Sequence, residues 1–171
     1  MDRDTPQGSV AGGGGLADAA APAATATTGR DPVIVGFLCH WCAYRAADVA
    51  GMARARYAPA MLPVRVPCSS RVDPEMVLSA LRDGADGVLI VGCHPGACHF
   101  VDGNLKALRR HALLQRLVAQ LGVEPERVRL LWVSATEGSV LAAAVDEMTE
   151  RLRQLGPLRW GASVLGAEDR P

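Results

Sequence analysis

The sequence lacks the features that mark several large classes of protein. Its 18 basic and 18 acidic residues cancel at neutral pH, which argues against electrostatic binding of nucleic acid. No apolar run approaches the roughly 18 residues that a membrane-spanning helix needs, so we expect no membrane partner. The first residues, Met1–Asp4, begin neither the basic region nor the compact apolar region of a secretory signal, and we therefore expect a cytoplasmic protein.

Motifs of the common enzyme classes are missing as well. No Gly-x-Gly-x-x-Gly follows a predicted strand, and the sequence contains neither a Walker loop nor a Gly-x-Ser-x-Gly elbow. No catalytic acid–base constellation stands out either. The sequence therefore gives no support to a dinucleotide-binding enzyme, a nucleotide hydrolase or a serine hydrolase.

The composition divides the chain into one domain and two tails. Residues 1–31 include four consecutive glycines and almost no large apolar side chain, so we expect a disordered tail. Residues 32–157 are long enough for one domain with a substantial core. Residues 158–171 look loosely attached, although Leu158, Trp160 and Leu165 could pack back onto the domain.

The domain alternates four times between an apolar run and a helical pattern. The runs predict strands at 33–37, 62–66, 87–91 and 128–133, and the patterns predict helices at 44–57, 74–83, 104–121 and 134–155. Such alternation predicts an α/β fold, a four-stranded parallel sheet with flanking helices. Right-handed crossovers favour the flavodoxin-like strand order 2-1-3-4.

Capping signals and periodic apolar residues define the last three helices. Asp73 is expected to cap the second helix, and Gly84 to close it. Residues 134–137 have the spacing of a capping box for the fourth helix. The expected buried residues of the third and fourth helices are Leu114, Leu117, Val118, Leu121, Val140, Leu141, Ala144, Val145, Met148 and Leu152.

All five cysteines are expected just past the ends of strands. Cys39 and Cys42 follow the first strand, Cys68 follows the second, and Cys93 and Cys98 follow the third. Because parallel strands end at the same edge of a sheet, the three loops are expected to converge. An odd number of cysteines in a reducing compartment argues against a purely disulfide framework and favours a metal or redox site.

Four thiolates suit either tetrahedral zinc or an iron–sulfur cluster, and spacing alone does not separate the two. The Cys-x4-Cys pair is unusual for a zinc ribbon, which favours a cluster over a zinc-stabilised interaction module. A second alternative is a thioredoxin-like dithiol oxidoreductase that uses Cys39 and Cys42 at a helix N-terminus, where a thiol pKa falls. That alternative leaves Cys68, Cys93 and Cys98 unexplained.

Histidine and tryptophan side chains adjoin the cysteines. The spacing of His40, His94 and His99 does not match a Rieske site, so we expect them to pack beside the centre or to donate hydrogen bonds to sulfur. Trp41 is expected to shield the site. We therefore predict all four as neighbours of the metal ligands.

The third predicted helix carries a group of basic residues, Lys106, Arg109, Arg110 and Arg116. The simplest interpretation is a solvated helix face, and the alternative is a docking surface for an acidic partner. His111 on the same helix is expected at its surface, far from the cysteines.

Three cysteine motifs in order resemble one known family. The stretches 33–44, 66–75 and 84–99, continued at 103–106 and 131–138, closely resemble the delta (iron–sulfur) subunit of the methyl-viologen-reducing hydrogenase family. The resemblance covers about residues 32–157.

This resemblance implies an oxidoreductase subunit with a [2Fe-2S] cluster and no substrate site of its own. Such a subunit passes electrons from a hydrogenase or a formate dehydrogenase to the flavin-containing subunit of a heterodisulfide reductase-type complex. Carried over by position, four of the five residues Cys39, Cys42, Cys68, Cys93 and Cys98 would be the ligands.

Overall fold

The computed structural model describes residues 30–160. Four strands, β1 (Ile34–Cys39), β2 (Met61–Val66), β3 (Gly87–Gly92) and β4 (Val128–Trp132), form one parallel sheet in the order β2-β1-β3-β4. The α/β class, the parallel sheet and the predicted strand order are therefore confirmed. From β1 the chain adds β2 on one side, and it then crosses over to add β3 and β4 on the other side. Folds of this kind bind ligands at this point of reversal, between β1 and β3.

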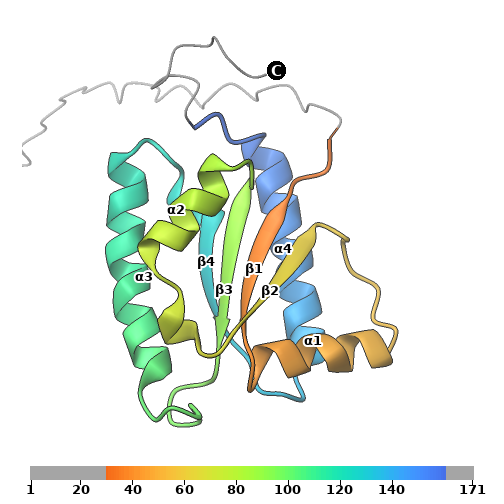
Figure 1. The fold of residues 1–171 in the computed structure, drawn as a ribbon. Helices are drawn as coiled ribbons and strands as arrows, with labels where there is room; N and C mark the ends of the chain where they lie inside the picture. The colour runs from red at the N-terminus through yellow and green to blue at the C-terminus, as the bar shows by residue number, and fades with distance from the viewer. Residues whose placement is uncertain (1–29, 161–171) are drawn as a thin grey trace, which may run out of the picture.

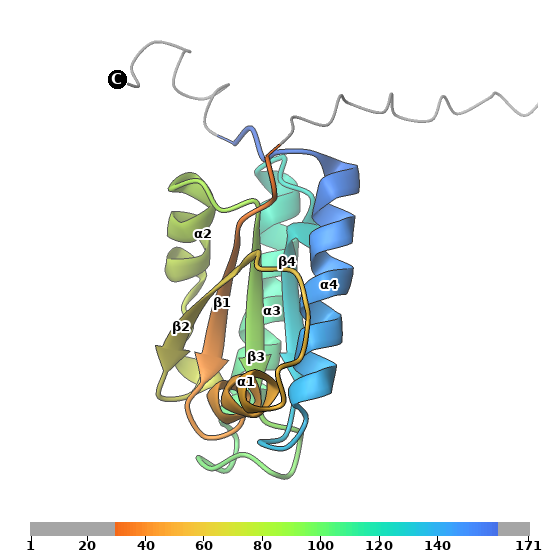
Figure 2. The ribbon, with the colours of Figure 1, turned by 90° about the vertical axis from the view of Figure 1, so that its right-hand side faces the viewer.

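Four helices cover the two faces of the sheet (Figures 1 and 2). Helices α1 (Ala43–Met52) and α4 (Gly138–Leu155) cover one face, whereas α2 (Pro74–Arg82) and α3 (Gly103–Gln120) cover the other. Short 3₁₀ turns at Ser69–Arg71 and Pro125–Arg127 precede α2 and β4. The Asp73 side chain accepts the Glu75 N–H at 3.2 Å, so the predicted cap of α2 is confirmed.

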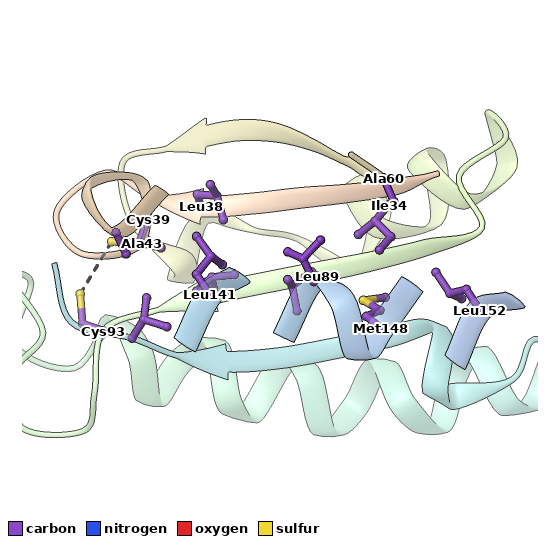
Figure 3. Close-up of a cluster of buried hydrophobic side chains, with 14 residues drawn as sticks. Ile34, Leu38, Cys39, Ala43, Ala60, Leu89, Cys93, Leu141, Met148 and Leu152 are labelled. Carbon is purple, nitrogen blue, oxygen red and sulfur yellow. Dashed lines mark hydrogen bonds between the residues drawn. The ribbon is translucent and has the colours of Figure 1, made fainter. Parts of the chain in front are cut away.

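The central strand β3 explains why each face has its own core. All six of its residues are buried, and alternate residues point to opposite faces. Leu89 and Val91 pack with α1 and α4, as Figure 3 shows in part. Val88 and Ile90 pack with α2 and α3. The partly buried Leu158 and Trp160 also pack against this second core, as the sequence suggested, while Leu165 lies outside the described residues.

Two helix boundaries differ from the sequence prediction. α1 ends at Met52, five residues early, because Arg54 adopts the left-handed conformation with φ +53° and reverses the chain. α4 begins at Gly138 rather than just after Ser134. At Gly138 a Cβ atom would lie 2.7 Å from the Ala50 backbone nitrogen of α1, so the two helices meet where only glycine fits.

Two predicted core positions are wrong. Leu121 and Val140 are each 42% exposed. Leu121 follows the last residue of α3, and Val140 faces away from the core although the adjacent Leu141 is buried. Leu117 is partly buried. The other seven predicted residues of α3 and α4 are buried, namely Leu114, Val118, Leu141, Ala144, Val145, Met148 and Leu152.

None of the helices within residues 30–160 is both long enough and apolar enough to cross a membrane.

Candidate metal centre

The three cysteine loops meet at the carboxyl edge of the sheet, as predicted. Cys39 is the last residue of β1, and its sulfur lies 3.8 Å from the sulfur of Cys93, which directly follows β3 (Figure 3). The Cys42 sulfur, just before α1, lies 2.7 Å from the Cys93 sulfur. Residues more than 50 positions apart in sequence thus form one sulfur group because β1 and β3 are neighbours.

The other two thiols approach the first turn of α3. A Cβ atom added to Gly103 would overlap the Cys68 sulfur and would lie 3.3 Å from the Cys98 sulfur. The absence of a side chain at Gly103 therefore creates the space that these two sulfurs share. All five cysteines are free thiols, and Cys98 also lies close enough to Cys42 to raise its pKa.

Burial raises the pKa of three of the thiols, Cys39, Cys42 and Cys93. It raises the pKa of Cys39 to about 11, against a smaller lowering by the backbone N–H groups of Trp41 and Cys42. Burial also raises the pKa of Cys93 to about 12, helped by the hydrogen bond with Cys42. The pKa of Cys42 is raised as well, mainly by burial. A metal cation would displace the thiol protons, because metals bind the thiolate.

Helix N-termini provide a favourable field for anionic sulfur. α1 begins directly after Cys42, and α3 begins beside Cys68 and Cys98. Neither N-cap residue makes a side-chain hydrogen bond, and the positive end of each helix dipole points toward this edge. The backbone N–H of His99 also bonds the Cys93 sulfur.

Asn104 fixes the loop that follows β3, and sequence analysis did not identify this role. Its side chain is fully buried and donates to the carbonyl oxygens of Cys93 and His94 at 3.0 and 2.7 Å. The same side chain accepts the Leu105 N–H. A polar residue at the start of a helix predicts a cap, but nothing in the local pattern indicates which loop it holds.

The aromatic neighbours pack together beside the thiols. The Trp41 ring stacks on the His99 ring, with centroids 3.6 Å apart. The His40 ring meets Trp41 edge-on at 5.1 Å, and His40 Nδ1 is buried without a hydrogen-bond partner among the described residues. Shielding of the site by Trp41 stays a prediction.

His94 connects the centre to the loop before α4. Its Nε2 lies 2.8 Å from a Glu137 carboxylate oxygen, which also accepts the Ser134 N–H at 2.6 Å. These two bonds hold the pKa of Glu137 at about 2, the Ser134 bond contributing most. None of the side-chain hydrogen bonds found in residues 30–160 runs from a histidine ring to sulfur. The N–H groups that reach sulfur belong to the backbone.

Within residues 30–160, no set of three or more His, Cys, Asp or Glu side chains is arranged to hold a metal ion. The five cysteines are nevertheless the residue type that holds an iron–sulfur cluster, which takes four Cys thiolates. The donor chemistry at this edge therefore fits such a cluster.

A large hollow lies away from the cysteines. It measures about 730 Å³ and runs along the free edge of β4, between residues of α3 and α4. His111 lines it and is half-buried rather than fully at the surface, with its ring close to Gln115 and the Val128 carbonyl.

Comparison with known proteins gives consistent matches over the described domain. Residues 34–156 match the family described as methyl-viologen-reducing hydrogenase, delta subunit. The chain is 52% identical over 130 residues to an F420-non-reducing hydrogenase iron-sulfur subunit of Archaeoglobus profundus, covering 76% of this chain and 95% of that protein. It is 45% identical over 127 residues to the vhc iron-sulfur subunit of the F420-non-reducing hydrogenase of Methanococcus voltae, covering 74% of this chain and 88% of that protein.

A longer protein contains a similar segment. The chain is 44% identical over 135 residues to one subunit of the ferredoxin/F420H2-dependent CoB-CoM heterodisulfide reductase of Methanosarcina acetivorans. The match covers 79% of this chain but only 17% of that protein.

Proposed function

Because this chain belongs to the methyl-viologen-reducing hydrogenase delta-subunit family, we propose that it is an electron-transfer subunit carrying a [2Fe-2S] cluster. Its relatives are named as hydrogenase and heterodisulfide reductase subunits, which supports a role in electron transfer within such complexes. The proposed donor is a hydrogenase or a formate dehydrogenase. The proposed acceptor is the flavin-containing subunit of a heterodisulfide reductase-type complex.

The convergence of five thiols at one sheet edge carries the proposal. We assign Cys68 and Cys98 as two of the four ligands, because Gly103 leaves room beside both sulfurs. Two of the three residues Cys39, Cys42 and Cys93 would complete the ligand set, since the Cys93 sulfur lies 3.8 Å from that of Cys39 and 2.7 Å from that of Cys42. When bound, the cluster would supply reversible one-electron reduction.

The chain's own residues orient this centre. Backbone N–H groups of Trp41 and His99 stabilise anionic sulfur, and such bonds also tune the reduction potential of a cluster. The stacked rings of Trp41 and His99 lie beside the proposed centre. Asn104 holds the Cys93 loop in place.

The heterodisulfide reductase relative supports the proposed acceptor. In Methanosarcina acetivorans a segment similar to this chain forms part of a longer heterodisulfide reductase polypeptide. Covalent linkage keeps two modules at high effective concentration. A separate chain with the same surface is therefore expected to bind a polypeptide of that kind.

Anaerobic purification of the full chain tests the cluster. We expect brown protein with about two irons per chain, visible absorption that bleaches on reduction, and an EPR signal from the reduced state. Colourless protein with about one zinc per chain would instead favour the zinc-stabilised interaction module.

Single cysteine variants test the ligand assignment. Cys68→Ser and Cys98→Ser are expected to abolish the visible absorption, whereas one of Cys39→Ser, Cys42→Ser and Cys93→Ser should retain it. Retention of the cluster in Cys68→Ser or Cys98→Ser would contradict the assignment. A dithiol oxidoreductase would behave differently, losing disulfide reductase activity in Cys39→Ser but keeping it in Cys93→Ser.

A further inference from the structure

An exposed apolar turn lies beside the thiols. Phe100 is 49% exposed and Val101 is 85% exposed. Val101 has φ +64°, a conformation that is a genuine outlier for a β-branched residue. Two backbone bonds maintain the turn: Val101 N–H donates to the Cys98 carbonyl at 3.0 Å, and Asp102 N–H donates to the Phe100 carbonyl at 2.8 Å. Strain of this kind concentrates at functional positions.

Phe100 and Pro67 line two neighbouring hollows and separate them. The first hollow, of about 310 Å³, is lined by Cys68 together with Gly103 and Lys106. The second, of about 400 Å³, is lined by His40 and Trp41 and by Arg65. The first hollow therefore reaches the thiol edge of the sheet at Cys68, and the second adjoins it at His40 and Trp41. We call this surface the Phe100 strip, comprising Trp41, Arg65, Pro67, Arg71, Phe100, Val101 and Lys106.

The charges of the Phe100 strip are mostly positive. Arg65, Arg71 and Lys106 line the two hollows, and the one carboxylate there, Asp102, lies 3.1 Å from the Lys106 ammonium. The whole chain carries no net charge, so this excess is a local property of the surface over the thiols. A positive surface attracts negatively charged partners and orients them as they approach.

We propose that the Phe100 strip docks the acidic face of a redox protein partner, an inference that rests on the proposed electron-transfer function. Aromatic and arginine side chains are enriched at protein interfaces and supply much of their binding energy. Phe100 and Trp41 provide the apolar contact, while Arg65, Arg71 and Lys106 select an acidic surface. Docking there brings the partner's redox group to the side of the protein where Cys68 lies.

Binding of an acidic flavodoxin to the full, cluster-loaded chain tests the proposal, with fluorescence anisotropy of the labelled flavodoxin as the readout. We expect the double variant Arg71→Glu/Lys106→Glu to weaken binding about tenfold at low ionic strength. Phe100→Ser is expected to weaken binding about threefold at any salt concentration, because it removes apolar contact. The control is Arg116→Glu, a single charge reversal about 15 Å along α3 from Lys106, which should change binding less than about twofold.

Three results would overturn the proposal. The first is that Arg116→Glu loses as much affinity for flavodoxin as the double variant. The second is that basic cytochrome c binds as tightly as flavodoxin. The third is that flavodoxin does not bind at low ionic strength. Visible absorption of the same samples separates this failure from a failure of the proposed function. Colourless wild-type protein contradicts the proposed cluster. Coloured protein that binds flavodoxin equally well with and without substitutions in the Phe100 strip contradicts only the docking surface.

Discussion

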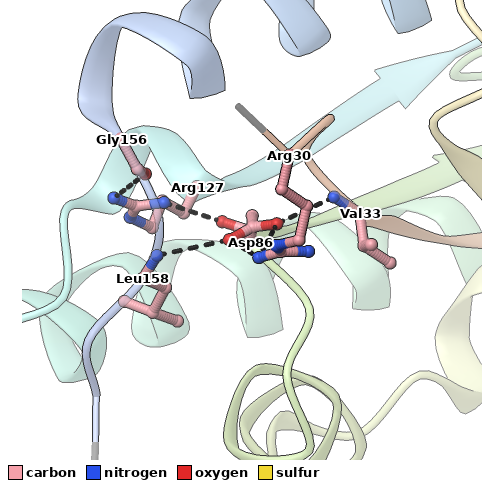
Figure 4. A network of polar contacts seen from close by, with 6 residues as sticks. All are labelled: Arg30, Val33, Asp86, Arg127, Gly156 and Leu158. Atoms are coloured by element: carbon pink, nitrogen blue, oxygen red, sulfur yellow. Dashed lines mark hydrogen bonds and ion pairs between the residues drawn. The ribbon is translucent and has the colours of Figure 1, made fainter. Parts of the chain in front are cut away.

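The two ends of the sheet contrast in how they satisfy buried polar groups. At the end where the strands begin, Asp86 and Arg127 are 2% and 1% exposed and are fully hydrogen-bonded (Figure 4). The Asp86 carboxylate accepts from Arg30, Val33 N–H and Leu158 N–H. At the end where the strands finish, three thiols are equally buried, namely Cys39, Cys68 and Cys93. The hydrogen bonds that the Cys39 and Cys93 side chains make run to the Pro67 carbonyl and to other thiols.

This contrast follows from the chemistry of the groups. A buried charge costs free energy unless the protein itself pairs it, so the Asp86–Arg127 end must be complete in the folded chain. A thiol is a weak hydrogen-bonding group and behaves as a small apolar side chain. The thiol end can therefore remain buried before a metal arrives. We expect changes at the first end to alter stability and changes at the second to alter the metal centre.

The largest effect on stability is expected from Arg127→Met. The Arg127 guanidinium donates to the carbonyl oxygens of Asp86 and Gly156 at 3.0 Å each and to Glu124 at 2.6 Å. Its loss leaves buried acceptors unpaired, which should reduce the free energy of unfolding by about 3 kcal/mol. Urea denaturation measures the loss.

The control for this variant is Arg151→Met, which removes an exposed ion pair with Glu126. It should cost at most about 1 kcal/mol. Native Arg127→Met protein is expected to retain the full cluster absorption. A cluster lost while the protein is still folded would show that the two ends are coupled.

An intermediate effect is expected from Gly103→Ala at the thiol end. The new methyl group would overlap the Cys68 sulfur and crowd the Cys98 sulfur at 3.3 Å. Such overpacking typically costs about 1–3 kcal/mol, and here it should displace the sulfurs from the proposed cluster. Iron content per chain and visible absorption are the measurements.

Gly51→Ala provides the matched control, because nothing lies within 4 Å of a Cβ at that helix position. This substitution should leave the iron content unchanged and stabilise α1 by about 0.5–1 kcal/mol. Equal iron content in Gly103→Ala and Gly51→Ala would refute the role given to Gly103.

The smallest effect is expected from His111→Gln, at the free edge of β4. Burial lowers the pKa of His111, and the bond to the Val128 carbonyl opposes this only partly. The unfolded chain therefore takes up a proton more readily, so stability should fall as the pH drops below about 6.5 toward the lower folded pKa. The charged residues facing the same hollow are Glu126, Arg129, Glu147, Glu150 and Arg151.

Urea midpoints at pH 7.5 and pH 5.5 measure this dependence in the wild type and in His111→Gln. The variant should show the smaller loss at pH 5.5, because glutamine does not titrate. The other histidines remain in both proteins and cancel in the comparison. An identical loss in both would exclude His111 as the source.

Some local signals in the sequence did not predict the structure on their own. Residues 134–137 have the spacing of a capping box, and Glu137 does accept the Ser134 N–H. The helix nevertheless begins only at Gly138, where its backbone approaches α1.

Arg30 and Asp31, which we assigned to the N-terminal tail, form ion pairs with Asp86 and Arg153. These contacts join residues distant in sequence, which no local pattern reveals.

The sequence by itself determined the alternation of strands and helices and placed every cysteine just past a strand. These follow from the periodicity of apolar residues and from local caps such as Asp73. The handedness of crossovers favoured the observed strand order without fixing it. Only the tertiary structure decided which sulfurs lie beside Gly103, which loop Asn104 holds, and that Asp86 and Arg127 are buried. The physical reason is that these features depend on distances between atoms of different elements, and close packing sets those distances after the elements have formed.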